Sequence, residues 1–321
     1  MRRSEVFSQK VQTIDRRYLY LILFVFTSIA VLFRGVILPT STTEHTIAFY
    51  REMMQIPSAS TILLESDWTY STRGENQGQL EALLRIIQSR KIKFALYSLT
   101  DAQAPEVAEE VITSLNQEFI RRGQLPLSKW EDWVNLGYFP DPTSFLASLV
   151  LNLPKTLKSI QNTSPNGNLR SVLESPVLSH IHQVENFKIL ICITGSNIIR
   201  TLIRLLGSPP KVTLAVMVTG VWGPEILNFY TAKLIKSVVI GLHGTVEIET
   251  MMANGINVPN KEGKIIVRSI VPGEIPELKH TTTYARGMSY YLALQVMFVL
   301  IIFAIILGNI GYFMSKRKPH D

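Results

Sequence analysis

Cysteine is nearly absent from this chain. Cys192 is the only cysteine in 321 residues, so the protein has no internal disulfide framework. It lies in the apolar run 189–193, which is typical of a central strand, and a buried lone thiol behaves as a small hydrophobe. We therefore do not expect a cysteine nucleophile.

The common catalytic and phosphate-binding signatures are also missing. The sequence contains no GxGxxG, GxxxxGK[ST], GxSxG or HExxH. His180 and His182 lie two residues apart, but no cysteine or third histidine is near them in sequence, and we interpret them as a surface pair. These absences indicate no particular cofactor and no metal site, and they lean against an enzymatic function.

Net charge is small in the middle of the chain, where basic and acidic side chains nearly balance, and most of the net charge of +7 lies at the ends. Residues 1–17 contain five basic and two acidic side chains, and residues 315–321 contain three basic and one acidic. Arg34 adds a further positive charge, so the remainder is close to neutral. A near-neutral domain lacks the basic surface that nucleic-acid binding requires, so we expect no nucleic-acid partner.

Two long apolar runs are present. Residues 18–38 and 289–314 are each long enough to cross a bilayer core, which takes about 20 residues. Basic residues are retained on the cytoplasmic side of membrane helices. We therefore predict two transmembrane helices in the plasma membrane, with the tails 1–17 and 315–321 cytoplasmic and the domain between them extracytoplasmic. The reverse orientation is the alternative.

Residues 44–253 alternate short β-type runs with longer amphipathic helical patterns. Strands are expected near 61–65, 94–99, 133–136, 189–194, 212–218 and 237–242. Helices are expected near 78–89, 105–122, 145–153, 197–206, 224–232 and 245–253. The alternation predicts an α/β fold, a Rossmann-like, doubly wound and mostly parallel sheet flanked by one N-terminal and one C-terminal transmembrane helix.

Two segments do not follow this pattern. Residues 161–177 are polar and rich in turn formers, and we interpret them as an exposed loop between two β-α-β halves. Residues 254–287 show little periodicity and are expected to form a stalk or cover segment leading to the membrane.

Polar residues follow the expected strands. In doubly wound sheets, ligands bind beyond the carboxyl ends of the strands. Asp67 and Asp101 follow two adjacent strands, and two carboxylates there could bind a polar ligand or a metal ion. Aspartate after a strand is also a common cap or turn former, which is the structural alternative.

Gly195, Ser196 and Asn197 follow the strand at 189–194. Backbone N–H groups at the start of a helix can bind an anion, although three residues are a short signal. Together with Asp67 and Asp101, these residues define the predicted ligand-binding crevice.

Three sequence blocks carry a resemblance. They are DWVNLGY at 132–138, GLHGTVEIE at 241–249 and LGNIGYF at 307–313. With them, the chain resembles an uncharacterised family of prokaryotic membrane-anchored α/β proteins that has NLGY, GxxGxxExE and C-terminal LGNIxYF blocks. The resemblance covers most of the chain and implies no known activity. It implies shared roles for four residues, Gly241, Gly244, Glu247 and Glu249.

The chain departs from that family pattern at two places. Pro140-Asp141-Pro142 stands where the family has paired glycines, and Thr245 and Val246 replace small alanines. A rigid turn in place of a flexible one changes how closely the backbone can approach a ligand. These departures suit a divergent copy with a structural role.

Three functions therefore stay open. The first is a non-enzymatic subunit of a membrane protein assembly, with integral membrane partners or further copies of itself. The second is an extracytoplasmic ligand-binding or sensor domain that uses the strand-end crevice. The third is a metal-assisted hydrolase at the same crevice. Fold analogy alone does not choose among them.

Overall fold

The computed structural model describes residues 16–32, 42–207, 211–259, 265–268 and 286–316. The chain divides into two compact units, Met1–Pro39 with Thr282–Asp321, and Thr40–Thr281. The second unit is the α/β domain. The first contains two apolar helices.

The domain is built on a six-stranded sheet in which all neighbouring strands run parallel, in the order β3-β2-β1-β6-β7-β8. The strands are β1 (Thr61–Asp67), β2 (Lys93–Ser98), β3 (Trp133–Tyr138), β6 (Leu190–Thr194), β7 (Leu214–Val218) and β8 (Ser237–Ile240). The chain winds outward from the centre in one direction and then, from the centre again, in the other. The predicted α/β, doubly wound, parallel sheet is confirmed.

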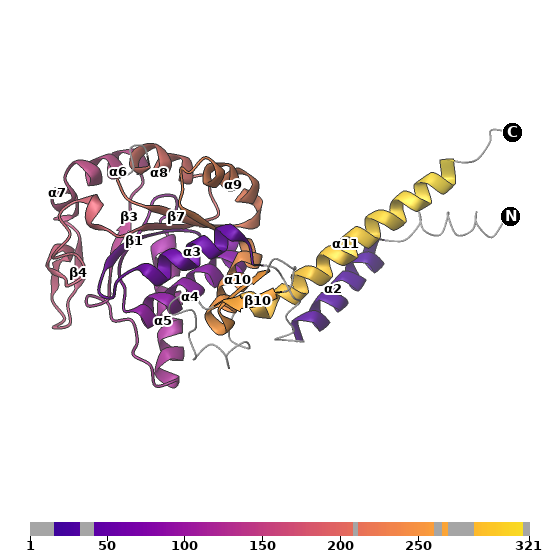
Figure 1. Ribbon diagram of the computed structural model, residues 1–321, viewed down its shortest axis with the longest axis horizontal. Coiled ribbons are helices and arrows are strands. Elements are labelled where there is room, and N and C mark those ends of the chain that lie inside the picture. The colour runs from indigo at the N-terminus through magenta and orange to yellow at the C-terminus, as the bar shows by residue number, and fades with distance from the viewer. Residues whose placement is uncertain (1–15, 33–41, 208–210, 260–264, 269–285, 317–321) are drawn as a thin grey trace. The chain divides into compact units, whose positions relative to one another are not determined.

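Helices cover both faces of the sheet (Figure 1). One face is covered by α3 (Glu44–Gln55), α4 (Arg73–Arg90), α5 (Ala104–Arg121) and α10 (Gly241–Asn254). The other face is covered by α6 (Pro142–Leu151), α7 (Leu153–Leu157), α8 (Ile199–Leu206) and α9 (Gly223–Thr231). Because side chains alternate along a strand, Ile62 and Leu64 of β1 enter the first core while Leu63 enters the second.

Local sequence explains where these helices begin. Pro105 lies in the first turn of α5, where its missing N–H is not needed, and Glu106 follows it near the positive end of the helix. At α6, the Asp141 side chain accepts a hydrogen bond from Ser144 N at 3.1 Å, with Pro142 as the first helical residue. The Pro140-Asp141-Pro142 segment therefore serves as a helix start.

Residues 161–177, expected to be an exposed loop, have defined structure. They contain the antiparallel hairpin of β4 (Gln161–Thr163) and β5 (Leu169–Ser171), followed by the short helix η2 (Val172–Glu174). Val172 and Val177 are fully buried in the second core. The segment was expected to be exposed because it is rich in turn-forming residues, and the two buried valines did not stand out in the sequence.

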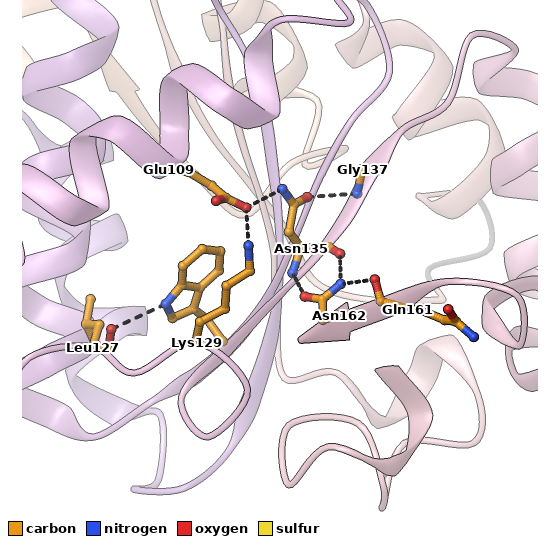
Figure 2. A network of polar contacts seen from close by, with 8 residues as sticks. Glu109, Leu127, Lys129, Asn135, Gly137, Gln161 and Asn162 are labelled. Atoms are coloured by element: carbon orange, nitrogen blue, oxygen red, sulfur yellow. Dashed lines mark hydrogen bonds and ion pairs between the residues drawn. The ribbon is translucent and has the colours of Figure 1, made fainter. Parts of the chain in front are cut away.

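The hairpin closes the outer edge of the sheet at β3. Asn162 Oδ1 accepts from Asn135 N at 2.8 Å, and Asn162 Nδ2 donates to Asn135 O at 2.7 Å (Figure 2). The Asn135 side chain in turn accepts from Gly137 N and donates to Glu109, which also pairs with Lys129. An amide side chain thus takes the place of a seventh strand and shields an edge that is otherwise open to pairing.

Part of the segment expected as a stalk or cover is described. β9 (Ile256–Pro259) and β10 (Ile265–Arg268) form a two-stranded antiparallel sheet. Residues 260–264 and 269–285 lie outside the described residues, so the interpretation of 254–287 as a stalk stays a prediction.

The first unit contains the membrane candidates, α2 (Arg16–Leu32) and α11 (Arg286–Lys316), which lie side by side. Within α11, residues Tyr290–Ile310 are long and apolar enough to cross a membrane. α2 is apolar but has 17 residues, short of the roughly 20 that a bilayer core requires. Residues 33–38 of the predicted first span lie outside the described residues, so the two-span arrangement and its orientation stay predictions.

Candidate functional site

The carboxyl ends of β1 and β6 mark the point where the strand order reverses, which is where doubly wound sheets bind ligands. In register, Asp67 of β1 pairs with Thr194 of β6. Gly195 and Ser196 follow directly. Asp67, Gly195 and Ser196 of the predicted crevice therefore lie together at this edge, and their contacts decide what the side chains do there.

The first turns of α4 place polar side chains against the neighbouring strand ends. Asn76 Nδ2 donates to Thr194 O at 3.4 Å, and Gln79 Nε2 donates to Val218 O, at the end of β7, at 2.8 Å. Thr72 packs against Gly195 so closely that a Cβ there would lie 2.8 Å from Thr72 Cγ2. The start of α4 is therefore bonded to the protein's own backbone at this edge.

The outer strand ends are tied in the same way. Glu75 Oε2 accepts from Gly220 N at 2.8 Å, and a Cβ on Gly241 would lie 2.7 Å from that oxygen. Gly241 has φ +57°, a conformation that favours glycine. Trp222 Nε1 donates to Gly195 O at 2.8 Å, which links the end of β7 to the end of β6.

Asp67 points into the protein. Its Oδ1 accepts from the Ser98 hydroxyl, from Leu99 N at 2.7 Å and from Thr100 N at 3.1 Å, and the side chain is 3 % exposed. Asp101 Oδ1 accepts from Gln103 N at 2.8 Å, a local bond that shapes the start of α5. Asp67 is therefore held by the loop that follows β2, and Asp101 by a contact within its own loop.

The Gly195-Ser196-Asn197 segment is partly engaged as well. Ser196 Oγ lies 2.9 Å from Thr194 Oγ1, and Ser196 N donates to the same hydroxyl. Asn197 is exposed, and α8 starts two residues later. Asn197 is thus the member of the predicted crevice that faces solvent.

A second carboxylate lies beside Asp67, and the sequence reasoning missed it. Glu65 is fully buried on β1, two residues before Asp67, so both side chains lie on the same face of the strand. Burial raises the pKa of Glu65 well above its ordinary value, and the Asp67 charge and a hydrogen bond with Asp67 raise it further. The Glu65 carboxyl is therefore neutral when Asp67 is charged.

The neighbours of Glu65 come from the adjacent strands in the same row of the sheet. Tyr97 of β2 and Cys192 of β6 pair with Glu65 in register. Tyr97 Oη donates to Glu65 Oε2 at 3.1 Å. Burial raises the pKa of both Tyr97 and Cys192 well above ordinary values, so the phenol and the thiol are neutral.

The four residues singled out by the sequence resemblance, Gly241, Gly244, Glu247 and Glu249, lie on α10. Gly244 has no room for a side chain, because a Cβ would lie 2.8 Å from Val239 Cγ1. Glu247 Oε1 and Oε2 accept from Thr43 N at 2.7 Å and from Thr43 Oγ1 at 2.8 Å. Glu247 therefore anchors the start of α3. Glu249, two residues on, is also buried.

Among the described residues, no group of three or more His, Cys, Asp or Glu side chains is placed to hold a metal ion. In comparisons with known proteins, no protein-family model, no curated protein and no solved structure matches the chain.

Proposed function

We propose that the protein is a membrane-anchored, non-enzymatic subunit of a membrane protein assembly. The observation that carries this proposal is the mutual bonding of polar groups at the carboxyl edge of the sheet. Side chains from the start of α4 occupy the strand ends where a ligand of this fold binds, and Asp67 is held by the loop that follows β2.

A ligand at this edge would have to displace those contacts. Each intramolecular hydrogen bond contributes about 1 kcal/mol net, and a buried group that loses its partner costs about 1–3 kcal/mol. Displacing the Asn76, Gln79 and Glu75 bonds together would offset much of the free energy gained by binding a small molecule. The edge is better suited to rigid support than to ligand exchange.

For the membrane part, we propose two spans with both termini in the cytoplasm and an extracytoplasmic domain. The apolar stretch of α11 and the basic residues outside it support this arrangement. The chain is convenient for a topology test, because its only cysteine, Cys192, is buried.

A membrane-impermeant maleimide applied to intact cells tests the orientation. Ser179, which is exposed in the domain, changed to cysteine should be labelled, whereas Ser4→Cys should be labelled only after the cells are lysed. The unmodified chain is the control for Cys192. The opposite labelling pattern would place the domain in the cytosol.

The subunit proposal is tested by purifying the tagged full chain from its own membranes in mild detergent. Mass spectrometry should find a membrane protein in stoichiometric amount, and purification through a tag on that partner should return this chain. If the co-purifying protein is a second copy of this chain, the assembly is a homo-oligomer, which also supports the proposal. A chain that elutes alone as a monomer would contradict the proposal.

A ligand-binding domain is the second candidate, and a cavity favours it. The cavity, of about 1000 Å³, lies near the amino ends of β7 and β8, and Arg51, Lys233 and Lys236 are among its lining residues. Glu52 is the acidic residue in the lining and pairs with Lys236 at 3.6 Å. A small anion that co-purifies with the wild-type chain and not with Arg51→Ala would favour this candidate.

A further inference from the structure

Two buried oxygens in the second core receive no hydrogen bond from any donor in the described part of the chain. They are Glu65 Oε1 and Asp67 Oδ2. The other oxygen of each side chain is occupied, Glu65 Oε2 by the Tyr97 hydroxyl and Asp67 Oδ1 by three donors. The two residues lie on one face of β1, so these oxygens belong to neighbouring side chains.

Two ionised carboxylates in this position would be costly. Both side chains are at most 3 % exposed, and like charges a few ångströms apart repel strongly where water is excluded. A single proton removes the problem, because one carboxyl then donates to the other carboxylate and both oxygens gain a partner.

We propose that Glu65 and Asp67 share one proton, and that the pair is a buried proton-binding site which makes the stability of the domain depend on pH. Glu65 holds the proton, since Asp67 receives three donors that suit a carboxylate and Glu65 receives one, the Tyr97 hydroxyl.

Among the described residues, the groups that face the pair include no cation that could replace the proton. From β2 the titratable group that faces Glu65 is Tyr97, and from β6 it is Cys192. Above them, α6 and α8 contribute apolar side chains, and Phe145 of α6 packs against the Tyr97 ring. The site is therefore closed to solvent and depends on its own proton.

The sign of the pH effect follows from linkage. In the unfolded chain Glu65 loses its proton near its ordinary pKa of about 4.3, whereas in the folded domain it keeps the proton to higher pH. The folded state then binds more protons than the unfolded state. The contribution of Glu65 to stability therefore falls as pH rises from about 4.3 to the raised pKa.

The test compares thermal unfolding midpoints of the full chain in mild detergent from pH 5 to pH 9, for the wild type and Glu65→Gln. The amide introduced by this change keeps the acceptor toward Tyr97 and offers a permanent N–H donor to Asp67. The midpoint of Glu65→Gln should exceed that of the wild type by several degrees at pH 8, and the difference should shrink toward pH 5. Glu131→Gln, at an exposed site, is the matched control.

A second readout does not depend on a variant being stable. The infrared spectrum of the wild type at neutral pH should contain the C=O band of a protonated carboxylic acid, which Glu65→Gln removes and Glu131→Gln retains. In Asp67→Asn, the amide can donate to Glu65, so the band should disappear at lower pH than in the wild type.

Two results would overturn the proposal. One is a wild-type spectrum without a protonated carboxyl at neutral pH, as expected if a trapped water or cation joins two ionised carboxylates. The other is a constant midpoint difference between the wild type and Glu65→Gln across the pH range. Neither result depends on whether a partner co-purifies, so the subunit proposal stands or fails separately.

Discussion

Two buried glutamates of this domain, Glu65 and Glu247, have the same side chain and nearly the same burial but opposite surroundings. Glu65 is 0 % exposed and Glu247 is 2 % exposed. Glu247 receives both donors of Thr43, the backbone N–H and the hydroxyl, on its two oxygens. Glu65 receives one neutral donor, the Tyr97 hydroxyl, and also faces the Asp67 carboxylate.

The difference shows that burial alone does not decide the role of a carboxylate. Hydrogen-bond donors stabilise the charged form, and a neighbouring negative charge destabilises it. With two donors directed at it, Glu247 joins α10 to the start of α3. With Asp67 beside it, Glu65 becomes a site that holds a proton. The hydrogen-bond donors around each carboxyl group therefore distinguish Glu247, which anchors a helix, from Glu65, which faces a second carboxylate.

Removing the anchor should have the largest effect. Glu247→Ala removes the carboxylate that accepts from Thr43 N and from Thr43 Oγ1, and hydrogen bonds to charged groups contribute about 1.5–3 kcal/mol. We expect a loss of about 3 kcal/mol in the free energy of unfolding, measured by denaturant titration at pH 7. Glu131→Ala, at an exposed position, should change it by less than about 0.5 kcal/mol. An equal loss of unfolding free energy in Glu247→Ala and Glu131→Ala would show that Glu247 does not anchor α3.

Removing one of the two donors should have an intermediate effect. Thr43→Val deletes the hydroxyl and keeps the backbone N–H, so Glu247 loses one bond of two, at a cost of about 1–2 kcal/mol. The double variant Thr43→Val with Glu247→Ala should cost less than the sum of the single changes, because both remove the same contact. Simple additivity would show that the two side chains are not coupled.

The smallest effect is expected at the donor to Glu65. Tyr97→Phe removes the hydroxyl that lowers the pKa of Glu65, so that pKa should rise further. The fall in stability with increasing pH should then extend to higher pH, with a change of less than about 1 kcal/mol at pH 6. The pH dependence of stability is measured as the midpoint of thermal unfolding between pH 6 and 9, and Tyr138→Phe is the control for loss of a tyrosine hydroxyl elsewhere. A shift to lower pH would contradict the assignment of Tyr97 as a donor.

Much of the fold was readable from the sequence. The alternation of β-type runs and amphipathic helices predicted the parallel sheet, and most helix and strand positions agree within a few residues. The start of α4 was placed too late, at 78 instead of Arg73, because its first turns carry polar residues. Those residues are polar because they bond to the strand ends, which a periodicity of apolar residues does not reveal.

The sequence placed the predicted crevice residues at one edge of the sheet, but it did not give their contacts, and a binding role for them stays a prediction. Asp67 lies at the edge expected, yet its carboxylate points inward to Ser98 and Leu99. Glu65 was assigned to the strand and not recognised as part of the site. The available signal was an acidic residue inside an otherwise apolar run, followed two positions later by another, which on a strand places both on one face.

By itself, the sequence determined the alternation of strands and helices, a long apolar segment at Tyr290–Ile310 and the near-neutral net charge of the domain, because these depend on composition and on spacing along the chain. Only the tertiary structure decided which groups meet across strands. The contacts of Glu247 with Thr43, of Asn162 with Asn135 and of Glu65 with Tyr97 join residues distant in sequence. Whether a buried carboxylate anchors a helix or holds a proton depends on such partners, since hydrogen bonding and local charge act through space.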